Sequence, residues 1–143
     1  MAATPFLSVV ITTYNDIHRL PTTVATISAS LVQQSFPAVI IVVDDSSTDG
    51  TAGLAASYAG VYMLRCKHRS KGVAVRVGAL PVRSEDVLLC DADLATPIEE
   101  WEQQGPHFSA GFDVVIRSRE RIGAQRYNEP FHRYLMGRIF KTC

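Results

Sequence analysis

The sequence predicts an α/β fold in which a mostly parallel sheet is sandwiched by helices. Two runs of β-branched apolar residues, 39–43 and 87–90, lack the alternation of apolar and polar side chains. Such runs are typical of parallel strands that are buried on both faces. Segments of helical character separate the runs, and this order of elements implies right-handed crossovers within one sheet.

The first half of the chain is expected to contribute two strands, each followed by a helix. Residues 7–12 predict the first strand and residues 39–43 the second. Between them a helix is expected over 18–34, where Pro21 is tolerated because it lies near the first turn. Residues 49–58 are rich in alanine and have Ser, Thr and Asp, the residues that cap helices, around their start, so they predict the second helix.

The next elements continue the alternation. A short third strand is expected at 61–65, a helix at 72–80 that ends before Pro81, and a fourth strand at 87–90. The order strand, helix, strand therefore repeats through most of the chain.

The last third of the chain carries weaker signals. Thr96-Pro97-Ile98-Glu99 reads as a capping box, which opens a helix to about residue 104. Trp101 is expected to pack this helix onto the sheet. Residues 113–116 predict a fifth strand, and residues 131–140 carry apolar side chains at helical spacing with basic residues between them.

Length and composition limit the class of protein. A chain of 143 residues suits one domain, and 47% hydrophobic residues exclude a disordered protein. No apolar run approaches the ~20 residues of a membrane-spanning helix. Cys66, Cys90 and Cys143 show no metal-ligand or paired spacing, so reduced thiols on the cytosolic side are expected.

The net charge of zero hides an asymmetry. Residues 1–113 carry seven Lys and Arg against twelve Asp and Glu, and residues 114–143 carry seven against two. A basic segment that follows an acidic one suits an anionic substrate or a lipid surface. A solvated basic helix face is the alternative.

Two acidic clusters stand directly behind predicted strands. Asp44 and Asp45 follow one strand, and Asp91 and Asp93 follow another. Parallel strands present their carboxyl ends at one edge of the sheet, where ligands bind in open α/β folds. Two carboxylates at Asp-x-Asp spacing can share a divalent cation such as Mg²⁺. Helix capping is the alternative for each cluster, but it explains only one residue of a pair.

No glycine-rich phosphate loop follows the first strand, where Thr12-Thr13-Tyr14-Asn15-Asp16 stands instead. The phosphates of a ligand must therefore be bound in another way, and a metal ion held by Asp91 and Asp93 would bind them. A nucleotidyltransferase should carry a glycine- and basic-rich loop at that place, so this function is the weaker alternative.

Four motifs, in order, resemble those of the family-2 glycosyltransferases over nearly the whole chain. They are residues 9–16 (VVITTYND), 42–51 (VVDDSSTDGT), 69–72 (RSKG) and 91–97 (DADLATP). The resemblance implies a GT-A fold and inverting transfer of a hexose from a nucleotide-diphosphate sugar. Within the family the chain is most similar to dolichyl-phosphate β-glucosyltransferases and dolichol-phosphate mannose synthases. The last two motifs lean towards the glucosyl group, and hence towards UDP-glucose.

The resemblance also implies roles for single residues. The residues implied to bind substrate are Thr12, Tyr14, Asp16, Val43, Asp45, Lys71, Asp91, Ala92 and Arg133. Asp91 and Asp93 would hold Mg²⁺ or Mn²⁺ on the diphosphate. Asp93 and Arg119 would be catalytic, because a metal and a guanidinium can neutralise charge on the departing diphosphate. Lys71 has an alternative as an exposed loop charge.

The implied acceptor is a polyprenyl or dolichyl phosphate, which is already anionic and needs little help from a general base. The implied location is the cytosolic face of the endoplasmic reticulum membrane, or the cytoplasmic side of a bacterial inner membrane. Contact with the membrane surface would involve the basic C-terminal segment or residues beyond it. No nucleic acid partner is expected.

The sequence also departs from the family pattern. Thr12 replaces a proline, Asp16 replaces a glutamate and Ser46 replaces a glycine. Ser46 predicts that its turn needs no positive φ. Family members continue well beyond the fifth strand, so we expect residues 1–143 to form a donor-binding domain whose acceptor part is missing. A catalytically incomplete nucleotide-sugar-binding remnant is therefore the main alternative function.

Overall fold

The computed structural model describes residues 4–67, 70–94 and 98–116. The chain divides into two compact units, Met1–Gln103 and Gln104–Cys143. The sheet, the helices that cover it and the candidate site all belong to the first unit.

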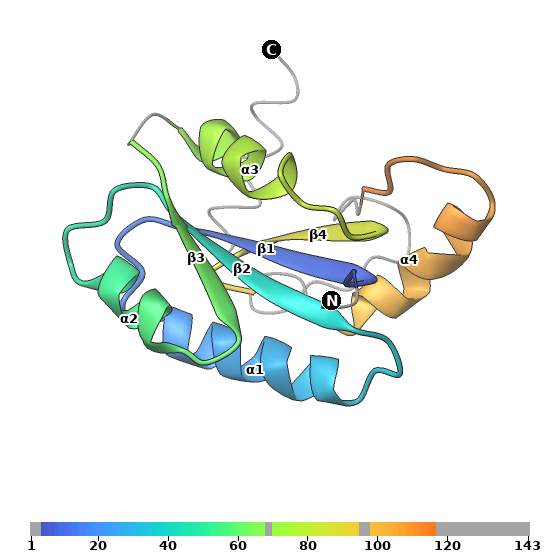
Figure 1. Ribbon diagram of the computed structural model, residues 1–143, viewed down its shortest axis with the longest axis horizontal. Coiled ribbons are helices and arrows are strands. Elements are labelled where there is room, and N and C mark those ends of the chain that lie inside the picture. The colour runs from blue at the N-terminus through green and yellow to red at the C-terminus, as the bar shows by residue number, and fades with distance from the viewer. Residues whose placement is uncertain (1–3, 68–69, 95–97, 117–143) are drawn as a thin grey trace, which may run out of the picture. The chain divides into compact units, whose positions relative to one another are not determined.

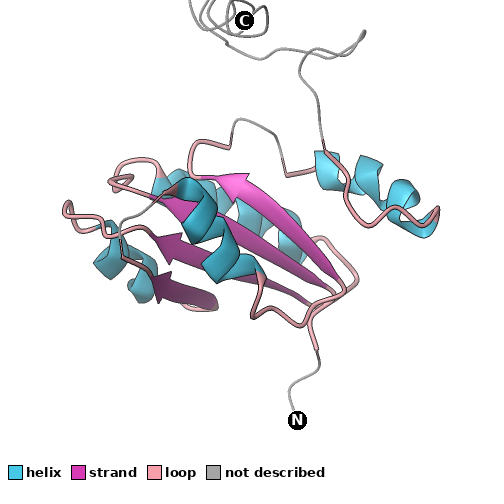
Figure 2. Ribbon diagram, turned by 90° about the horizontal axis from the view of Figure 1, so that it is seen from above, coloured by secondary structure: helices cyan, strands magenta, loops and turns pink. Residues whose placement is uncertain are grey.

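Four parallel strands form one sheet in the order β3-β2-β1-β4 (Figures 1 and 2). The strands are β1 (Leu7–Thr13), β2 (Ala38–Asp44), β3 (Val61–Arg65) and β4 (Asp86–Asp91). The predicted parallel sheet is therefore confirmed. Each observed strand lies within two residues of its predicted bounds.

Helices cover both faces of this sheet. Helices α1 (Leu20–Val32) and α2 (Thr51–Ser57) lie on one face and α3 (Lys71–Ala79) lies on the other (Figure 1). The chain places β2 and β3 on one side of β1 and then places β4 on the opposite side. The boundary between β1 and β4 is thus a topological switch point, the usual place for a ligand in such folds.

Strand β1 is the centre of the hydrophobic core. Its side chains alternate between the two helical layers, and almost all of them are inaccessible to solvent. The larger layer includes Leu7, Val9 and Ile11 of β1, Leu20, Val24 and Ile27 of α1, Ile40 and Val42 of β2, and Ala55 of α2. The smaller layer comprises Val10, Val43 and Ala74.

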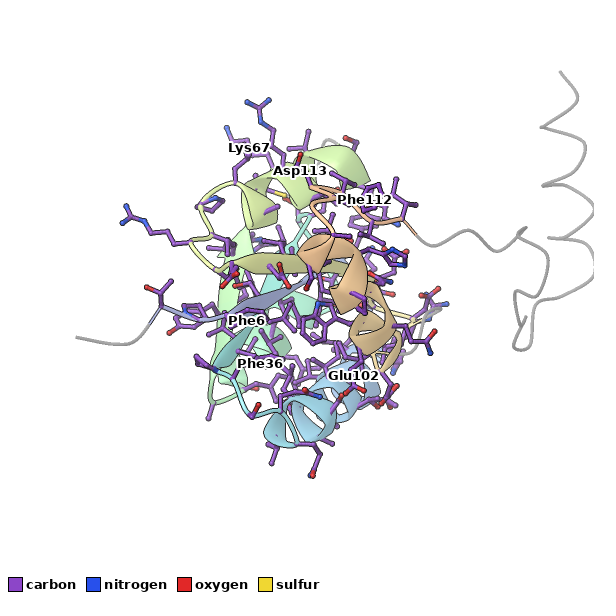
Figure 3. The ribbon with its side chains drawn as sticks, turned by 90° about the vertical axis from the view of Figure 1, so that its right-hand side faces the viewer. Phe6, Phe36, Lys67, Glu102, Phe112 and Asp113 are labelled. Carbon is purple, nitrogen blue, oxygen red and sulfur yellow. The ribbon has the colours of Figure 1, made fainter. Side chains whose placement is uncertain are left out.

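Helix α4 (Glu100–Ser109) begins against this core. The Trp101 ring lies 5.2 Å from that of Phe36 and 6.3 Å from that of Phe6, measured between centroids. Figure 3 shows Phe6 and Phe36 side by side, and their centroids are 4.9 Å apart. Trp101 was expected to pack its helix onto the sheet; its ring packs against the larger layer of the core through Phe6 and Phe36, which stand just before β1 and β2. The predicted end near residue 104 is wrong, because α4 continues through Pro106 to Ser109.

The predicted fifth strand at 113–116 is also wrong. These residues have no strand geometry, and Val114 and Ile116 are 73% and 84% exposed. A run of β-branched residues becomes a strand only where a neighbour accepts its backbone hydrogen bonds, and none of the described backbone hydrogen bonds involves residues 113–116. Thr96 and Pro97 of the predicted capping box, and the basic segment 131–140, lie outside the described residues. Among the helices that the structure describes, none has the length and apolarity to cross a bilayer.

Gly78 sets how closely α3 approaches the sheet. A Cβ added at this position would lie 2.5 Å from Val10 Cγ1 and 2.7 Å from Val43 Cγ2. Both contacts are with buried side chains that cannot move without disturbing the core.

We therefore predict that Gly78→Ala lowers the free energy of unfolding by about 1–3 kcal/mol, the usual cost of overpacking. Gly53→Ala is the matched control, because nothing lies within 4 Å of a Cβ added there in α2. That control should be neutral or stabilising by about 0.5–1 kcal/mol, since alanine favours a helix. Urea denaturation followed by circular dichroism measures both variants, and equal effects would contradict the packing argument.

Candidate active site

A cleft of about 330 Å³ opens at the carboxyl edge of the sheet, next to the switch point between β1 and β4. Its volume falls at the lower end of the roughly 300–1,000 Å³ typical of small-molecule sites. The lining residues come from segments far apart in the sequence. They are Thr12, Thr13, Tyr14, Asp16, Arg19, Asp45, Ser70, Lys71, Ala74, Asp91 and Asp93.

The sheet register brings these segments together. Thr12 pairs with Val43 of β2 on one side and with Asp91 of β4 on the other. The strands therefore end at the same level, and the residues that follow β1, β2 and β4 surround one space. The acidic clusters predicted from the sequence thus meet at a single edge.

Side-chain hydrogen bonds join the loop after β1 to the loop after β2. The Asn15 N–H donates to Ser47 Oγ (2.8 Å), and Asn15 Oδ1 accepts the Thr48 N–H (2.9 Å). Asn15 has a φ of +54°, a conformation that asparagine tolerates better than most residues. These contacts fix the position of the neighbouring Tyr14 and Asp16 at the cleft. Asn15 was not among the predicted site residues, although the pair Asn15-Asp16 directly after a strand is a known turn signal.

Asp49 makes a second connection between the same two loops. Its carboxylate accepts the Ile17 N–H (3.1 Å) and the Thr51 N–H (3.0 Å), together with the Thr51 hydroxyl. The hydrogen bond from that hydroxyl is the main reason that the pKa of Asp49 lies below its usual value. Asp49 is therefore ionised and structural, although it belongs to the acidic motif.

The two aspartates of the first cluster have different environments. Asp44 is inaccessible to solvent; its Oδ2 accepts the Ser47 N–H (3.1 Å) and lies 3.4 Å from Arg65 Nε. Asp45 lines the cleft, and its Oδ1 accepts a hydrogen bond from Cys66 Sγ (3.4 Å). Asp44 thus shapes the turn, and Asp45 is the member of the pair that can meet a ligand.

The turn after β2 corrects one prediction. Ser46 has a φ of +65°, so this turn does require a positive φ even though its residue is not glycine. The Ser46 hydroxyl donates to the Cys66 carbonyl at 2.7 Å, which offsets part of the backbone strain. A serine can therefore occupy a position that the family pattern gives to glycine.

The second acidic cluster lies at the end of β4. Asp91 is the last residue of the strand, and the Leu94 N–H donates to its carbonyl (3.1 Å), which closes a turn that contains Asp93. The Asp91 carboxylate forms an ion pair with Lys71, whose Nζ lies 2.6 Å from Oδ1 and 2.7 Å from Oδ2. Within the described residues, no three His, Cys, Asp or Glu side chains gather as a complete metal site.

The described lining of the cleft carries more negative than positive charge. Four carboxylates face two cationic side chains, and each cation already contacts a carboxylate. Lys71 pairs with Asp91, and Arg19 Nη1 lies 3.2 Å from Asp16 Oδ1. Arg19 was not among the predicted site residues. Its position three residues after Asp16, at the start of α1, could have indicated that it pairs with Asp16 at the site.

Some predicted residues lie elsewhere. The side chain of Val43 packs in the core with Val10 and Ala74. Ala92 is 4% exposed, packs against the larger core layer, and its carbonyl accepts the Thr23 hydroxyl. Neither side chain lines the cleft, because Val43 points into the core from strand β2 and Ala92 is buried in the turn after β4. Arg119 and Arg133 lie outside the described residues.

Cys90 precedes Asp91 but cannot supply a thiolate near neutral pH. Burial, and then the negative charge of Asp91, raise the pKa of the Cys90 thiol from 9.0 to about 11. Burial likewise raises the pKa of Cys66. Since the thiolate is the form that attacks electrophiles, neither thiol is activated as a nucleophile at neutral pH.

The raised pKa predicts a dependence of stability on pH. The native state disfavours the Cys90 thiolate. The contribution of the protonated thiol to the free energy of unfolding is therefore complete below about pH 9 and is lost as the pH rises towards 11. Cys90→Ala should make the free energy of unfolding fall less steeply between these values. The measurement is urea denaturation of both proteins at pH 8, 9, 10 and 11. An unchanged difference in stability across the series would contradict this.

Comparisons with known proteins agree with this geometry. The model of the family Glycosyl transferase family 2 matches residues 8–142. The chain is 36% identical over 109 residues to the dolichyl-phosphate beta-glucosyltransferase of Drosophila melanogaster, which covers 68% of this chain and 33% of that protein. It is 31% identical over 134 residues to the undecaprenyl-phosphate 4-deoxy-4-formamido-L-arabinose transferase of Pseudomonas fluorescens (strain SBW25), which covers 90% of this chain and 38% of that protein.

The fold has a counterpart among solved structures. A mannosyltransferase from Pyrobaculum calidifontis, in complex with GDP-Man and Mn²⁺, superposes with a TM-score of 0.54 at 25% identity. That match covers 64% of this chain and 28% of the other. The chain thus spans about a third of the length of the curated relatives it matches. With the family model covering almost all of its length, the chain belongs to glycosyl transferase family 2.

Proposed function

We propose that this chain binds a nucleotide-diphosphate sugar and transfers its hexose to a polyprenyl phosphate, with inversion at the anomeric carbon. The observation that carries the proposal is the cleft at the carboxyl edge, where Asp45, Lys71, Asp91 and Asp93 meet. Two relatives with different sugars in their names share a polyprenyl-phosphate acceptor, which supports this acceptor class. Glucose, and therefore UDP-glucose, is the hexose donor that we favour because of the likeness to the β-glucosyltransferases.

The donor set of the cleft fits a divalent cation. Mg²⁺ is commonly held by one or two carboxylates together with substrate phosphates, rather than by a cage of protein ligands. Asp91 and Asp93 supply two carboxylates at one turn, and no larger cluster of ligands is needed. Mg²⁺ or Mn²⁺ bound here would neutralise charge on the diphosphate.

Charge balance in the described cleft also favours such a cation. With four carboxylates and two paired cations, the lining by itself would repel an anionic diphosphate. A divalent ion would offset that excess and let the diphosphate approach Asp91 and Asp93.

The other lining residues would bind and orient the donor. Tyr14 offers a ring that is 48% exposed for stacking against a base, and Asp45 offers a carboxylate for a ribose hydroxyl or a base N–H. Thr12 and Asp16 complete the nucleotide wall. The sugar would then project from the diphosphate towards the acceptor.

The transfer itself would be a direct displacement. An oxygen of the polyprenyl phosphate attacks the anomeric carbon while the bond to the nucleoside diphosphate breaks, which converts an α-linked donor into a β-linked product. The phosphate is already ionised, so no general base is required. Arg119, by the family resemblance, would stabilise the departing diphosphate, and Arg133 would bind near the same phosphates.

A polyprenyl phosphate resides in a membrane, so the reaction would take place at a membrane surface. The seven Lys and Arg residues of segment 114–143 suit the anionic lipid there. We propose the cytosolic face of the endoplasmic reticulum membrane, or the cytoplasmic side of an inner membrane, as the location.

Asp93→Ala tests the metal assignment. We expect it to weaken Mn²⁺-dependent binding of UDP by at least about tenfold, since even outer-sphere partners of a metal are worth 10–100-fold. Asp86→Ala is the matched control, because Asp86 lies at the amino end of the same strand. Isothermal titration of UDP with and without Mn²⁺ gives the affinities. Unchanged affinity in the Asp93 variant would refute the assignment.

A transfer assay separates catalysis from binding alone. The chain is incubated with Mn²⁺, a short polyprenyl phosphate and either UDP-glucose or GDP-mannose, and the lipid product is followed by mass spectrometry. We expect a lipid-linked hexose from UDP-glucose. Metal-dependent binding without product would identify a nucleotide-sugar-binding remnant, and no binding of either donor would refute both functions.

A further inference from the structure

Lys71 contacts both oxygens of the Asp91 carboxylate, which is one of the two proposed metal ligands. Its Nζ lies 2.6 Å from Oδ1 and 2.7 Å from Oδ2. A single ammonium group therefore lies against both oxygens, on the side from which this carboxylate would contact another cation with both of them. The ion pair and a metal compete for the same oxygens.

The two partners come from different elements that line the cleft. Lys71 is the first residue of α3, and Asp91 is the last residue of β4. The Lys71 backbone is held in place, because the Ser70 side chain caps α3 by accepting the Val73 N–H at 3.4 Å. The Lys71 side chain remains 65% exposed, so its ammonium can turn about a fixed backbone.

Breaking the ion pair between Lys71 and Asp91 costs little free energy. The side chains of Lys71 and Asp91 are 65% and 45% exposed, and ion pairs in contact with water contribute little stability. An exchange of partners is favourable if the ammonium gains another anion at the moment that Asp91 gains another cation. A metal-bound diphosphate supplies both charges at the same time.

We propose that Lys71 is a positioning residue that couples metal binding to donor binding; the inference rests on the proposed function. Without a donor, the Lys71 ammonium neutralises Asp91 and keeps the affinity for a divalent cation low. When a nucleotide diphosphate enters, the ammonium leaves Asp91 for a diphosphate oxygen, and Asp91 becomes available to the cation. Each ligand thus raises the affinity for the other by the same factor, as linkage requires.

The test compares the affinity for Mn²⁺ alone, measured by electron paramagnetic resonance of free Mn²⁺, with the affinity in the presence of UDP. In the wild-type chain we expect UDP to tighten Mn²⁺ binding by a factor within the usual range of about 5–150. Lys71→Gln should bind Mn²⁺ alone more tightly than the wild type and UDP with Mn²⁺ more weakly. The coupling factor should therefore fall towards one. Lys71→Arg keeps the charge and should retain weak binding of Mn²⁺ alone.

Arg19→Gln is the matched control, because it removes the same charge from the same cleft without uncovering Asp91. It should tighten Mn²⁺ binding less than Lys71→Gln does. Equal tightening in the two variants would overturn the proposal in favour of a general charge effect, and unchanged Mn²⁺ affinity in Lys71→Gln would also overturn it. If the wild-type chain binds neither UDP nor GDP with Mn²⁺, the proposed function fails instead. Thermal unfolding verifies that each variant is folded.

Discussion

The register of β1 between β2 and β4 is the constraint on which the site depends. Thr12 pairs with Val43 on one side and with Asp91 on the other, so three strand ends stand at one level. A shift by one residue would turn every β1 side chain to the opposite layer. Leu7, Val9 and Ile11 prevent this, because the large helical layer receives them only in the observed register. Core packing therefore places the carboxylates.

The loops above that edge keep their shape through polar contacts. Asn15 and Asp49 join the loop after β1 to the loop after β2, and they do so through backbone N–H groups that no strand or helix satisfies. The hydrogen bonds of the Ile17 and Thr51 N–H groups are partly buried, and a donor withdrawn from water without a partner is costly, so these contacts also stabilise the fold. The result is a cleft wall that is ordered before a ligand arrives, which reduces the conformational entropy that binding must overcome.

The sheet, its helices and the meeting of the acidic clusters could be predicted because they follow from periodic apolar runs and from the geometry of parallel strands. The boundary of α4 and the absence of a strand at 113–116 could not. The first depends on whether a helix tolerates Pro106, and the second on whether a neighbouring strand is present to pair. The local sequence shows neither whether the helix tolerates this proline nor whether a partner strand is present. The positive φ of Ser46 was also missed, since the hydrogen bond to the Cys66 carbonyl is a contact across 20 residues.

The local sequence also does not predict which role each aspartate has, because the aspartates are chemically identical and differ only in their surroundings. Asp44 is buried under a turn, and Asp49 holds two loops together. Asp45, Asp91 and Asp93 line the cleft. The motif alone distinguishes none of these, because the difference lies in burial and in hydrogen-bond partners. Asp44 and Asp49 lie outside the cleft lining and accept backbone N–H groups, so they are committed to the fold. Among the described residues Asp91 is paired with the exposed ammonium of Lys71, and it can exchange that partner. Exchangeable partners, rather than acidity, therefore identify the carboxylates that can serve a ligand.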